Sequence, residues 1–343
     1  MSRVREVVTF ILPVLNRQQV IVRAIESCLA CSSERIEPRV LVVDGGSRDD
    51  TVTRVMTTFA TDHRVMLLPQ PSDRPGFMNA CIFAVEHLDS PLATFMYSDD
   101  LVSPSFVKLA EALAADPDVS IAFGYGQQAK EDELIVFPPV TVVERVHAER
   151  VLEAFYGRVE HLDGRSLPVS PVCCVVRSPV LKAWADHVQS FTSRRPLREH
   201  AVIRLAGGPD LMIYLSALLK GGQYALRANA VVGQLTVTAA SITMSGNREA
   251  QLTVGYWLAR VWGFFEADRT GRRELAAGFA GYLLAVWLFI LGKKFVRLEF
   301  SWISELLGEA RGIIVTLAKQ KTLSMALSGL LASVWSRIRM ILA

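Results

Sequence analysis

Carboxylates follow two of the apolar runs in the first hundred residues, at points where they could bind a charged ligand. An Asp-Gly-Gly-Ser segment begins at Asp44, and the adjacent pair Asp99 and Asp100 follows a later run. Two neighbouring acids repel one another unless a cation or a hydrogen-bond donor is shared between them. The pair therefore predicts a site that holds a cation or a donor group.

A further acid, Asp210, lies beyond a Gly-Gly-Pro segment at the start of a helical run. A carboxylate at this place can cap the helix through its first backbone N–H groups. It can also act as a general base that takes a proton from an attacking hydroxyl. The residues alone leave both roles open for Asp210, whereas Asp49, Asp50 and Thr51 are expected to cap the helix that follows them.

The elements that position these residues alternate between short β-branched runs and segments of helical period, from residue 7 to about residue 123. The expected strands are Val7–Leu12, Val40–Val43, Val65–Leu68, Leu92–Tyr97 and Val119–Phe123. The expected apolar helix faces are Val20, Ala24 and Cys28; Val52, Val55, Met56 and Phe59; Met78, Ile82 and Val85; and Phe106, Leu109 and Leu113. This alternation predicts an α/β fold with a doubly wound, mainly parallel sheet, which binds ligands beyond the carboxyl ends of its strands.

Five motifs then occur in a fixed order. They are Pro13-x-x-Asn16, Val-Val-Asp-Gly-Gly-Ser at 42–47, Ser-Asp-Arg-Pro-Gly-Phe-Met-Asn at 72–79, Tyr-Ser-Asp-Asp at 97–100 and Gly-Gly-Pro-Asp at 207–210. Together they resemble glycosyltransferase family 2, whose members have the GT-A fold. The resemblance covers residues 5 to 245, about two thirds of the chain.

The resemblance implies a role for each motif. The residues that it implies for nucleotide-sugar binding are Pro13, Val14, Leu15, Asn16, Asp44, Asp73, Asn79 and Asp99. It also implies that Asp100, together with Asp99, ligates a divalent metal, Mn²⁺ or Mg²⁺, that bridges the diphosphate. Asp210 matches the catalytic base. Many members have two acids where this chain has Asp44 and a glycine, so the nucleotide base stays open.

The chemistry of sugar transfer agrees with these roles. A diphosphate leaves readily only when its charge is neutralised, and a hard cation held by carboxylates does this. The acceptor hydroxyl needs a separate carboxylate base on the opposite face of the sugar. We therefore expect an inverting, metal-dependent glycosyltransferase of the hexosyltransferase type. It would move a sugar from a nucleotide-sugar donor to a glycan or lipid-linked acceptor in polysaccharide or glycoconjugate biosynthesis.

Two other classes of function stay open on the sequence. A nucleotidyltransferase shares the fold class, but it should carry a glycine-rich phosphate loop after the first strand, and residues 12–17 contain no glycine. A Gly-x-Gly-x-x-Ala segment at 124–129 suggests a dinucleotide site, yet a charged turn, a strand and two prolines are expected after it rather than a helix. A non-catalytic membrane-bound partner protein would bind no nucleotide.

Composition divides the chain into two parts. Of 343 residues 51% are hydrophobic and 21% charged, which excludes a disordered protein, and a net charge of +3 is too small to predict nucleic acid as a partner. The expected catalytic domain covers residues 1–247, with a nucleotide-binding half at 1–125 and an acceptor-side half at 126–247. A helical extension follows at 248–343. The five cysteines are expected to be packing residues, and the oligomeric state is left open.

The helical extension has the composition of a membrane-associating segment. Residues 275–292 carry no charge, and residues 260–343 contain 12 Lys and Arg against 6 Asp and Glu. Basic residues beside apolar helices are attracted by anionic lipid headgroups. The expected location is the cytoplasmic face of the inner or plasma membrane, peripheral or shallowly inserted. The alternative is that these helices cover their own catalytic domain. An arginine cluster at 194–204 is either a solvated face or a site for a diphosphate or a phospholipid-linked acceptor.

Overall fold

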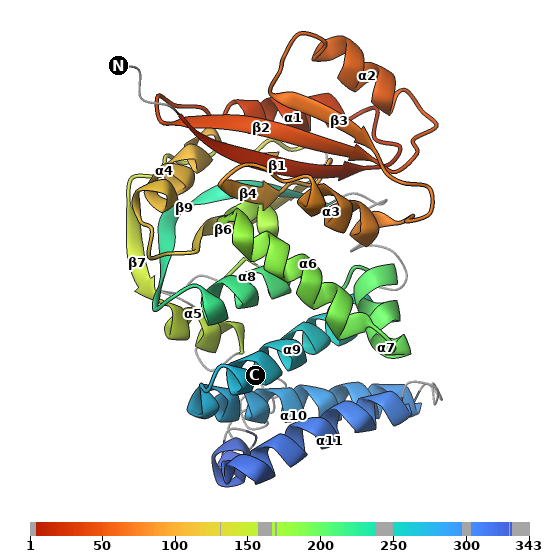
Figure 1. Ribbon diagram of the computed structural model, residues 1–343, viewed down its shortest axis with the longest axis vertical. Coiled ribbons are helices and arrows are strands. Elements are labelled where there is room, and N and C mark those ends of the chain that lie inside the picture. The colour runs from red at the N-terminus through yellow and green to blue at the C-terminus, as the bar shows by residue number, and fades with distance from the viewer. Residues whose placement is uncertain are drawn as a thin grey trace.

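The computed structural model describes residues 5–130, 132–156, 167–168, 170–237, 250–296, 303–328 and 330. Its central element is a nine-stranded mixed sheet, covered by helices on both faces (Figure 1). The strands are β1 (Glu6–Val14), β2 (Ile36–Asp44), β3 (Val65–Pro69), β4 (Leu92–Phe95), β5 (Leu101–Val102), β6 (Ile121–Lys130), β7 (Val143–His147), β8 (Cys174–Arg177) and β9 (Tyr224–Val237).

The sheet has a parallel part and a mixed part. Its order is β3-β2-β1-β4-β8-β6-β9-β5, with β7 paired to β9. β1 pairs in parallel with β2 and β4, and β2 pairs in parallel with β3. β8 lies antiparallel between β4 and β6, while β5 and β7 are antiparallel to β9. The doubly wound α/β sheet predicted for the first part of the chain is therefore confirmed.

The helices lie between the strands and then beyond them. They are α1 (Ile21–Leu29), α2 (Thr51–Thr58), α3 (Phe77–Glu86), α4 (Val107–Ala115), α5 (Ala148–Phe155), α6 (Ser178–Thr192), α7 (Pro196–Arg198), α8 (Pro209–Lys220), α9 (Tyr256–Arg269), α10 (Arg273–Val296) and α11 (Ile303–Gln320). Two π-helical segments, η3 (Glu199–Arg204) and η5 (Ala250–Gly255), precede α8 and α9. On α2 one predicted core residue, Met56, is 62% exposed, and the buried residues of that helix are Thr51 and Val55.

Two other expectations differ from the structure for local reasons. The apolar run Val169–Val176 predicts a buried strand, but β8 begins only at Cys174, since Pro171 starts a 3-10 turn and has no N–H to donate. A strand was also expected within 131–140, where the described residues 132–140 form none. The Gly-x-Gly-x-x-Ala segment lies inside β6 and does not precede a helix. A dinucleotide site needs the amino end of a helix after such a segment, so this result agrees with the rejection of that site.

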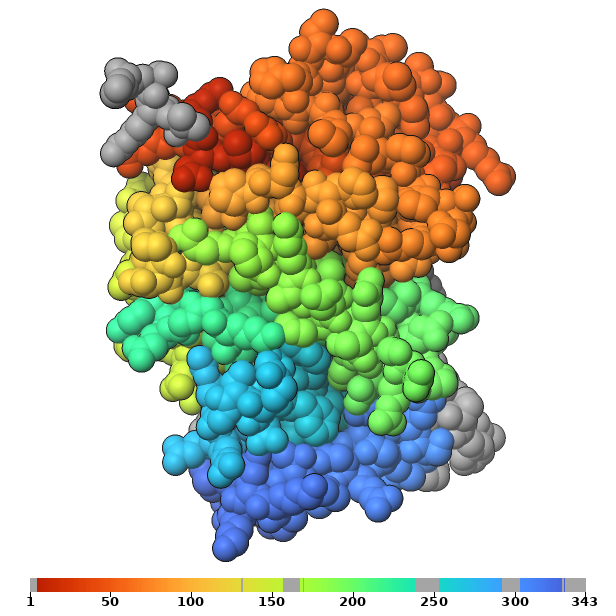
Figure 2. All heavy atoms as spheres, viewed as in Figure 1, coloured from red at the N-terminus to blue at the C-terminus, as the bar shows by residue number. Residues whose placement is uncertain are grey.

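The core has two parts, one on each face of the sheet. α1 and α4 cover one face, and α3, α6 and α8 cover the other. The second part continues without a break into α9, α10 and α11. Figure 2 shows these last helices as the end of the molecule opposite α2, in continuous contact with the elements above them. The five cysteines are buried and free, as expected of packing residues.

Specific contacts join α10 and α11 to the rest of the protein. The ring of Phe279 stacks on that of Tyr156 with 3.6 Å between centroids. Arg198, just before η3, forms a two-pronged ion pair with Glu309 on α11, at 2.7 Å for each bond. The indole N–H of Trp287 donates to the carbonyl of Leu306 over 2.9 Å and ties α10 to α11. The extension and the sheet therefore share one core.

Among the residues that the structure describes, one helix is long and apolar enough to cross a membrane by length and composition. It covers Arg273–Leu291, and 56% of it is buried within the protein. The segment Pro196–Arg204 and α8 are long and apolar enough only when they are taken together, and the angle between them is 99°. The partial burial of α10 agrees with the alternative that these helices cover their own domain, and the expected membrane contact stays a prediction. Its exposed side chains include Leu288 at 49% and Phe289 at 47%.

Candidate active site

The carboxyl ends of β1, β2 and β4 meet at one edge of the sheet. Val14 at the end of β1 lies opposite Asp44 at the end of β2. After β4, the N–H of Met96 donates to the carbonyl of Ile11 over 2.8 Å. The segments that follow these strands, including Asp99 and its neighbours, are thereby brought to the same edge. This is the position at which a doubly wound sheet binds its ligands.

Hydrogen bonds join the first two motifs. The backbone N–H of Asn16 donates to the hydroxyl of Ser47 over 2.9 Å, and the N–H of Arg48 donates to Oδ1 of Asn16 over 2.8 Å. The carboxylate of Asp44 accepts from the N–H groups of Gly46 and Ser47, each at 3.1 Å. Asp44 is only 8% exposed. In this structure its carboxylate orders the loop between β2 and α2, and Pro13 and Val14 are buried beside it.

The helix after this loop is capped in part as expected. Asp49 accepts hydrogen bonds from the N–H of Thr51 over 3.0 Å and from the N–H of Gln18 over 3.1 Å. Asp50 is the residue before α2, but its side chain makes no capping bond. Leu15 at the end of the first motif is 51% exposed and faces solvent at this edge.

The third motif forms the loop between β3 and α3. Asp73 is exposed, and the side-chain amide of Asn79 donates to the carbonyl of Pro75 over 2.7 Å. Gln70, which the sequence analysis did not select, connects this loop to the second motif. Its backbone N–H donates to the carbonyl of Asp44 over 2.8 Å, and its side-chain amide donates to the carbonyl of Gly76 over 2.9 Å. No feature of the sequence around Gln70 marks it for this role.

The acid pair after β4 has one buried member. Asp100 is 5% exposed, and its Oδ1 accepts from the backbone N–H of Thr236 on β9 over 2.7 Å. Burial raises the pKa of Asp100 well above its usual range, and the negative charges of Asp99 and Asp210 raise it further. Asp99 is partly exposed. A cation at this pair would offset both the burial and the repulsion.

The carboxylates of Asp99 and Asp100 fit a hard divalent cation whose remaining ligands come from substrate and water. Within the described ranges, no group of three or more His, Cys, Asp or Glu side chains is arranged to hold a metal ion. Mg²⁺ is commonly bound through one or two carboxylates, with substrate phosphates and water as its other ligands. Asp99 and Asp100 supply carboxylates of that number and type. The residues present therefore fit a cation that binds together with a diphosphate.

Asp210 is not the cap of α8. The residue before the helix is Gly208, with a φ of 87°, and no side chain caps the helix start. Asp210 lies in the first turn, and its Oδ1 accepts a hydrogen bond from the hydroxyl of Tyr97 over 2.8 Å. Burial raises the pKa of Asp210 to about 6, and the bond from Tyr97 opposes part of that rise. A carboxylate with this pKa is ionised at neutral pH and retains appreciable basicity.

Two residues that the sequence analysis did not select hold Asp210 in place. Tyr97 lies within the fourth motif, whose acids alone were assigned a role. Trp184 on α6 donates its indole N–H to the carbonyl of Pro209 over 2.9 Å, and it fixes the start of α8. The motif itself could have pointed to Tyr97. Nothing around Trp184 separates it from an ordinary core tryptophan.

The arginine cluster does not form a single site. Arg198 is paired with Glu309, and Arg204 is paired with Glu199 at 3.1 Å on the surface. Arg194 and Arg195 are exposed. Arg198 therefore stabilises the contact with α11 and is not available to a diphosphate in this structure.

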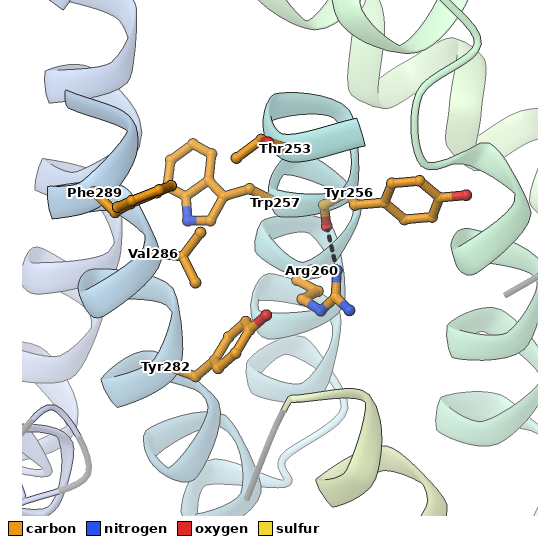
Figure 3. A pocket seen from close by; sticks show the side chains of 7 residues that line it. All are labelled: Thr253, Tyr256, Trp257, Arg260, Tyr282, Val286 and Phe289. Atoms are coloured by element: carbon orange, nitrogen blue, oxygen red, sulfur yellow. Dashed lines mark hydrogen bonds between the residues drawn. The ribbon is translucent and has the colours of Figure 1, made fainter. Parts of the chain in front are cut away.

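A cavity of about 160 Å³ lies between α9 and α10, away from the acidic edge of the sheet. Its lining residues are Thr253, Tyr256, Trp257, Arg260, Tyr282, Val286 and Phe289. Figure 3 shows that the ring of Tyr256 points away from this cavity, whereas Tyr282 and Phe289 close its other side. The cavity holds no acid pair and does not form part of the candidate site.

Comparisons with known proteins relate part of this chain to a known family. The model of Glycosyl transferase family 2 matches residues 9–163. A comparison with curated proteins finds no match. Among solved structures, S. aureus TarS 1–349 in complex with UDP-GlcNAc is similar, with a TM-score of 0.60 and 12% identity over 97% of this chain and 92% of that chain. A second structure of S. aureus TarS 1–349 gives a TM-score of 0.58 at 13% identity, over 97% of this chain and 91% of that chain.

A longer TarS structure is also similar, with a TM-score of 0.52 and 13% identity over 82% of this chain and 43% of that chain. Identities this low establish the fold, which extends over the sheet and the helices beyond it. The family match covers the segments after β1, β2, β3 and β4, including the acid pair. Residues 9–163 therefore belong to glycosyltransferase family 2, and the chain is a glycosyltransferase of the GT-A fold.

Proposed function

We propose that this glycosyltransferase is an inverting, metal-dependent enzyme that uses a nucleotide-sugar donor and a hydroxyl acceptor on a glycan or a lipid-linked glycan. The observation that carries the proposal is the link between two motifs at the sheet edge. Tyr97, two residues before Asp99, bonds to Asp210 and brings a carboxylate from α8 to the acid pair. Catalysis of sugar transfer needs these two functions, charge neutralisation and a base, on separate groups.

In the proposed reaction Asp210 is the base. The oxygen of the acceptor hydroxyl attacks the anomeric carbon and gives its proton to the Asp210 carboxylate. The new glycosidic bond forms as the bond between that carbon and the diphosphate oxygen breaks. The nucleoside diphosphate leaves with the bonding electron pair. Attack on the face opposite the leaving group inverts the configuration of the sugar.

Asp99 and Asp100 are the proposed ligands of Mn²⁺ or Mg²⁺. When bound, such a cation neutralises the charge that develops on the leaving diphosphate. The proposed nucleotide-sugar site lies along the same edge and comprises Pro13, Val14, Leu15, Asn16, Asp44, Asp73, Asn79 and Asp99. The bonds of Asp44 to its own loop support a role in shaping the backbone that meets the nucleotide.

UDP is the first nucleotide to test. The TarS structures were obtained with UDP-GlcNAc in one case and with UDP in another. The test is a thermal-shift series with UDP-, GDP- and dTDP-sugars, with and without Mn²⁺, followed by measurement of nucleotide release. A ligand that binds only the folded state raises the melting temperature. We expect a metal-dependent shift with one nucleotide and release of its diphosphate. Formation of pyrophosphate from a sugar phosphate and a nucleoside triphosphate would indicate a nucleotidyltransferase instead.

We also propose that the helical extension binds the cytoplasmic face of a membrane, peripherally or by shallow insertion. Several large apolar side chains on α10, on α11 and in the residues that follow are between 38% and 49% exposed. They are Leu288, Phe289, Leu307, Ile314, Val315, Leu323, Met325 and Leu327. Lys319 and Lys321 are close to them in sequence, where anionic headgroups would attract them. A lipid-linked acceptor would then share a surface with the enzyme.

A further inference from the structure

The start of α9 is in backbone contact with the loop that carries Asp210. A methyl group on Gly208 would lie 2.4 Å from the carbonyl oxygen of Gly255. A methyl group on Gly255 would lie 2.5 Å from the carbonyl oxygen of Gly207. Real side-chain carbons do not approach oxygen this closely, so only glycine fits on both sides of the contact. Residues almost fifty positions apart in sequence therefore meet without any side chain between them.

Unusual backbone lies on both sides of this contact. The π-helical segment η3 ends at Arg204 and leads into the loop, and η5 ends at Gly255 and leads into α9. Within the loop, Ala206 has a φ of 50° and Gly208 a φ of 87°. π-helical turns are rare and often occur at functional sites. Left-handed conformations of this kind persist only where the surrounding structure holds them.

Tyr256 follows Gly255 and is the first residue of α9. Figure 3 shows Tyr256 directed away from the cavity between α9 and α10. Burial raises the pKa of Tyr256, and the negative charge of Asp210 raises it further. Tyr256 is partly buried and packs against the core beneath α8.

We propose that Gly255 and Tyr256 are positioning residues for the transfer reaction. The Gly255 backbone fixes the loop of Gly207 and Gly208, and Tyr256 covers Asp210 from water, so that the first turn of α9 sets where the base lies. This inference rests on the proposed function of Asp210. It makes the helical extension part of the catalytic machinery, in addition to any role in binding a membrane.

The expected size of the effect follows from geometry. A methyl group at Gly255 forces the loop to move, and a misplacement of about 1 Å can reduce the rate of a catalysed reaction by about 100-fold. The proposed nucleotide site is carried by the segments after β1, β2, β3 and β4 and does not use this loop. Gly255→Ala should therefore lower kcat for UDP release from UDP-GlcNAc by about 10- to 100-fold. The KM for UDP-GlcNAc should change by less than about 2-fold, since the contacts that bind the donor equally well before and during the reaction are unaltered.

Gly263→Ala is the matched control on the same helix. A methyl group there would lie 2.5 Å from the hydroxyl of Tyr156 and 3.0 Å from Leu215 on α8, so it disturbs the packing of α9 against α8 about one and a half helical turns from Asp210, without entering the backbone contact with Gly207 and Gly208. Gly308→Ala on α11 is the second control, because no atom lies within 4 Å of the added methyl. Circular dichroism and UDP binding measure how much of each variant is folded. Rates are then compared per folded molecule.

Tyr256→Ala adds no atoms, so it cannot prevent folding through a steric clash. It opens the surroundings of Asp210 to water, which relieves the burial that raises the pKa of that carboxylate. The inflection in the pH dependence of kcat should therefore move below about 6. Other titratable groups within electrostatic reach of Asp210 are Cys81, Tyr97, Asp100, Cys174 and Tyr214. None of them is changed by the substitution.

The outcomes separate this inference from the proposed function. A fall in kcat for Gly255→Ala but not for Gly263→Ala, with an unchanged KM, supports the positioning role. Equal kcat per folded molecule in these two variants overturns it, as does an unmoved pH inflection in Tyr256→Ala. Asp210→Asn is measured in parallel: if that variant keeps the wild-type rate, the assignment of the base fails, whatever the glycine variants show.

Discussion

The hydroxyl of Tyr97 donates a hydrogen bond to Oδ1 of Asp210 across 2.8 Å, and the two residues are 113 positions apart. Tyr97 follows β4 and immediately precedes the segment with the acid pair, whereas Asp210 lies in the first turn of α8. The bond therefore connects the segment of the proposed metal ligands with the helix that carries the proposed base. It also favours the ionised form of Asp210, which is the form that accepts a proton.

Asp210→Asn removes the proposed base and keeps the shape of the side chain. Transfer should fall by roughly two to four orders of magnitude, the contribution typical of a positioned general base. Binding of UDP should be retained, because the loops after β1 and β2 are unchanged. Steady-state kinetics and isothermal calorimetry measure the two quantities. Wild-type turnover in this variant would leave Asp210 with a structural role only.

The pH dependence of kcat should report the ionisation of Asp210. Its pKa of about 6 means that the rate should rise with pH through that value, as the carboxylate loses its proton. Tyr97→Phe removes a hydrogen bond that lowers this pKa, so the inflection should move to higher pH. Phe83→Leu, at another aromatic position, should leave the inflection where it is. A profile that is identical in wild type and Tyr97→Phe would contradict the role given to the bond.

Asp100→Asn should abolish turnover with little effect on folding. The amide oxygen can still accept the hydrogen bond from Thr236, so the local structure is kept, but a neutral amide binds a hard cation more weakly. EDTA should inactivate the wild-type enzyme, and added Mn²⁺ should restore it. Asp118→Asn, whose side chain is 84% exposed in the native protein, is the control for loss of a carboxylate. Full activity in chelator would rule out the metal.

Flotation with vesicles tests the proposed membrane contact. The full chain should float with vesicles that contain anionic lipid, and less with neutral ones, because basic residues contribute to binding. Replacing both Leu288 and Phe289 by Gln should reduce flotation, since their apolar surface is lost. Met56→Gln on α2 is the control, as Met56 is 62% exposed on another part of the protein. Equal flotation of the two variants would place the contact elsewhere.

Arg198→Ala should destabilise the protein by about 3 to 5 kcal/mol, because it leaves the carboxylate of Glu309 buried without its partner. The two side chains are 14% and 8% exposed, so water cannot replace the lost bonds easily. Arg204→Ala removes an exposed ion pair and should change stability by less than about 1 kcal/mol. Denaturant unfolding of both variants gives the comparison. Similar midpoints would show that the contact with α11 does not contribute.

The strands were predictable from sequence because their signal is local. Each run of β-branched residues in the first part of the chain forms a strand, and polar segments at the carboxyl ends of β1, β2 and β4 meet as the topology requires. The exposure of Met56 was not predictable, since the apolar period of α2 does not reveal how much of that helix the rest of the protein covers.

The remaining differences depend on distant partners. In the sequence, Arg198 belongs to a basic cluster. Only the fold places Glu309, which is 111 positions away, in contact with it. The acceptor for the indole of Trp184 is a backbone carbonyl, which has no sequence signature. The contact between Gly255 and Gly207 is of the same kind, because it is made by main-chain atoms. Such relationships follow from packing, and local patterns do not contain them.

The core on the α3, α6 and α8 face of the sheet is continuous with the terminal helices, so we expect the described residues to unfold as one cooperative unit. Apolar residues of α3, α6 and α8 pack in the same cluster as those of α9, α10 and α11. Heat or denaturant should therefore melt both ends in a single transition. By mass action, a nucleotide bound at the sheet edge then stabilises the terminal helices, and a lipid bound to those helices stabilises the nucleotide site.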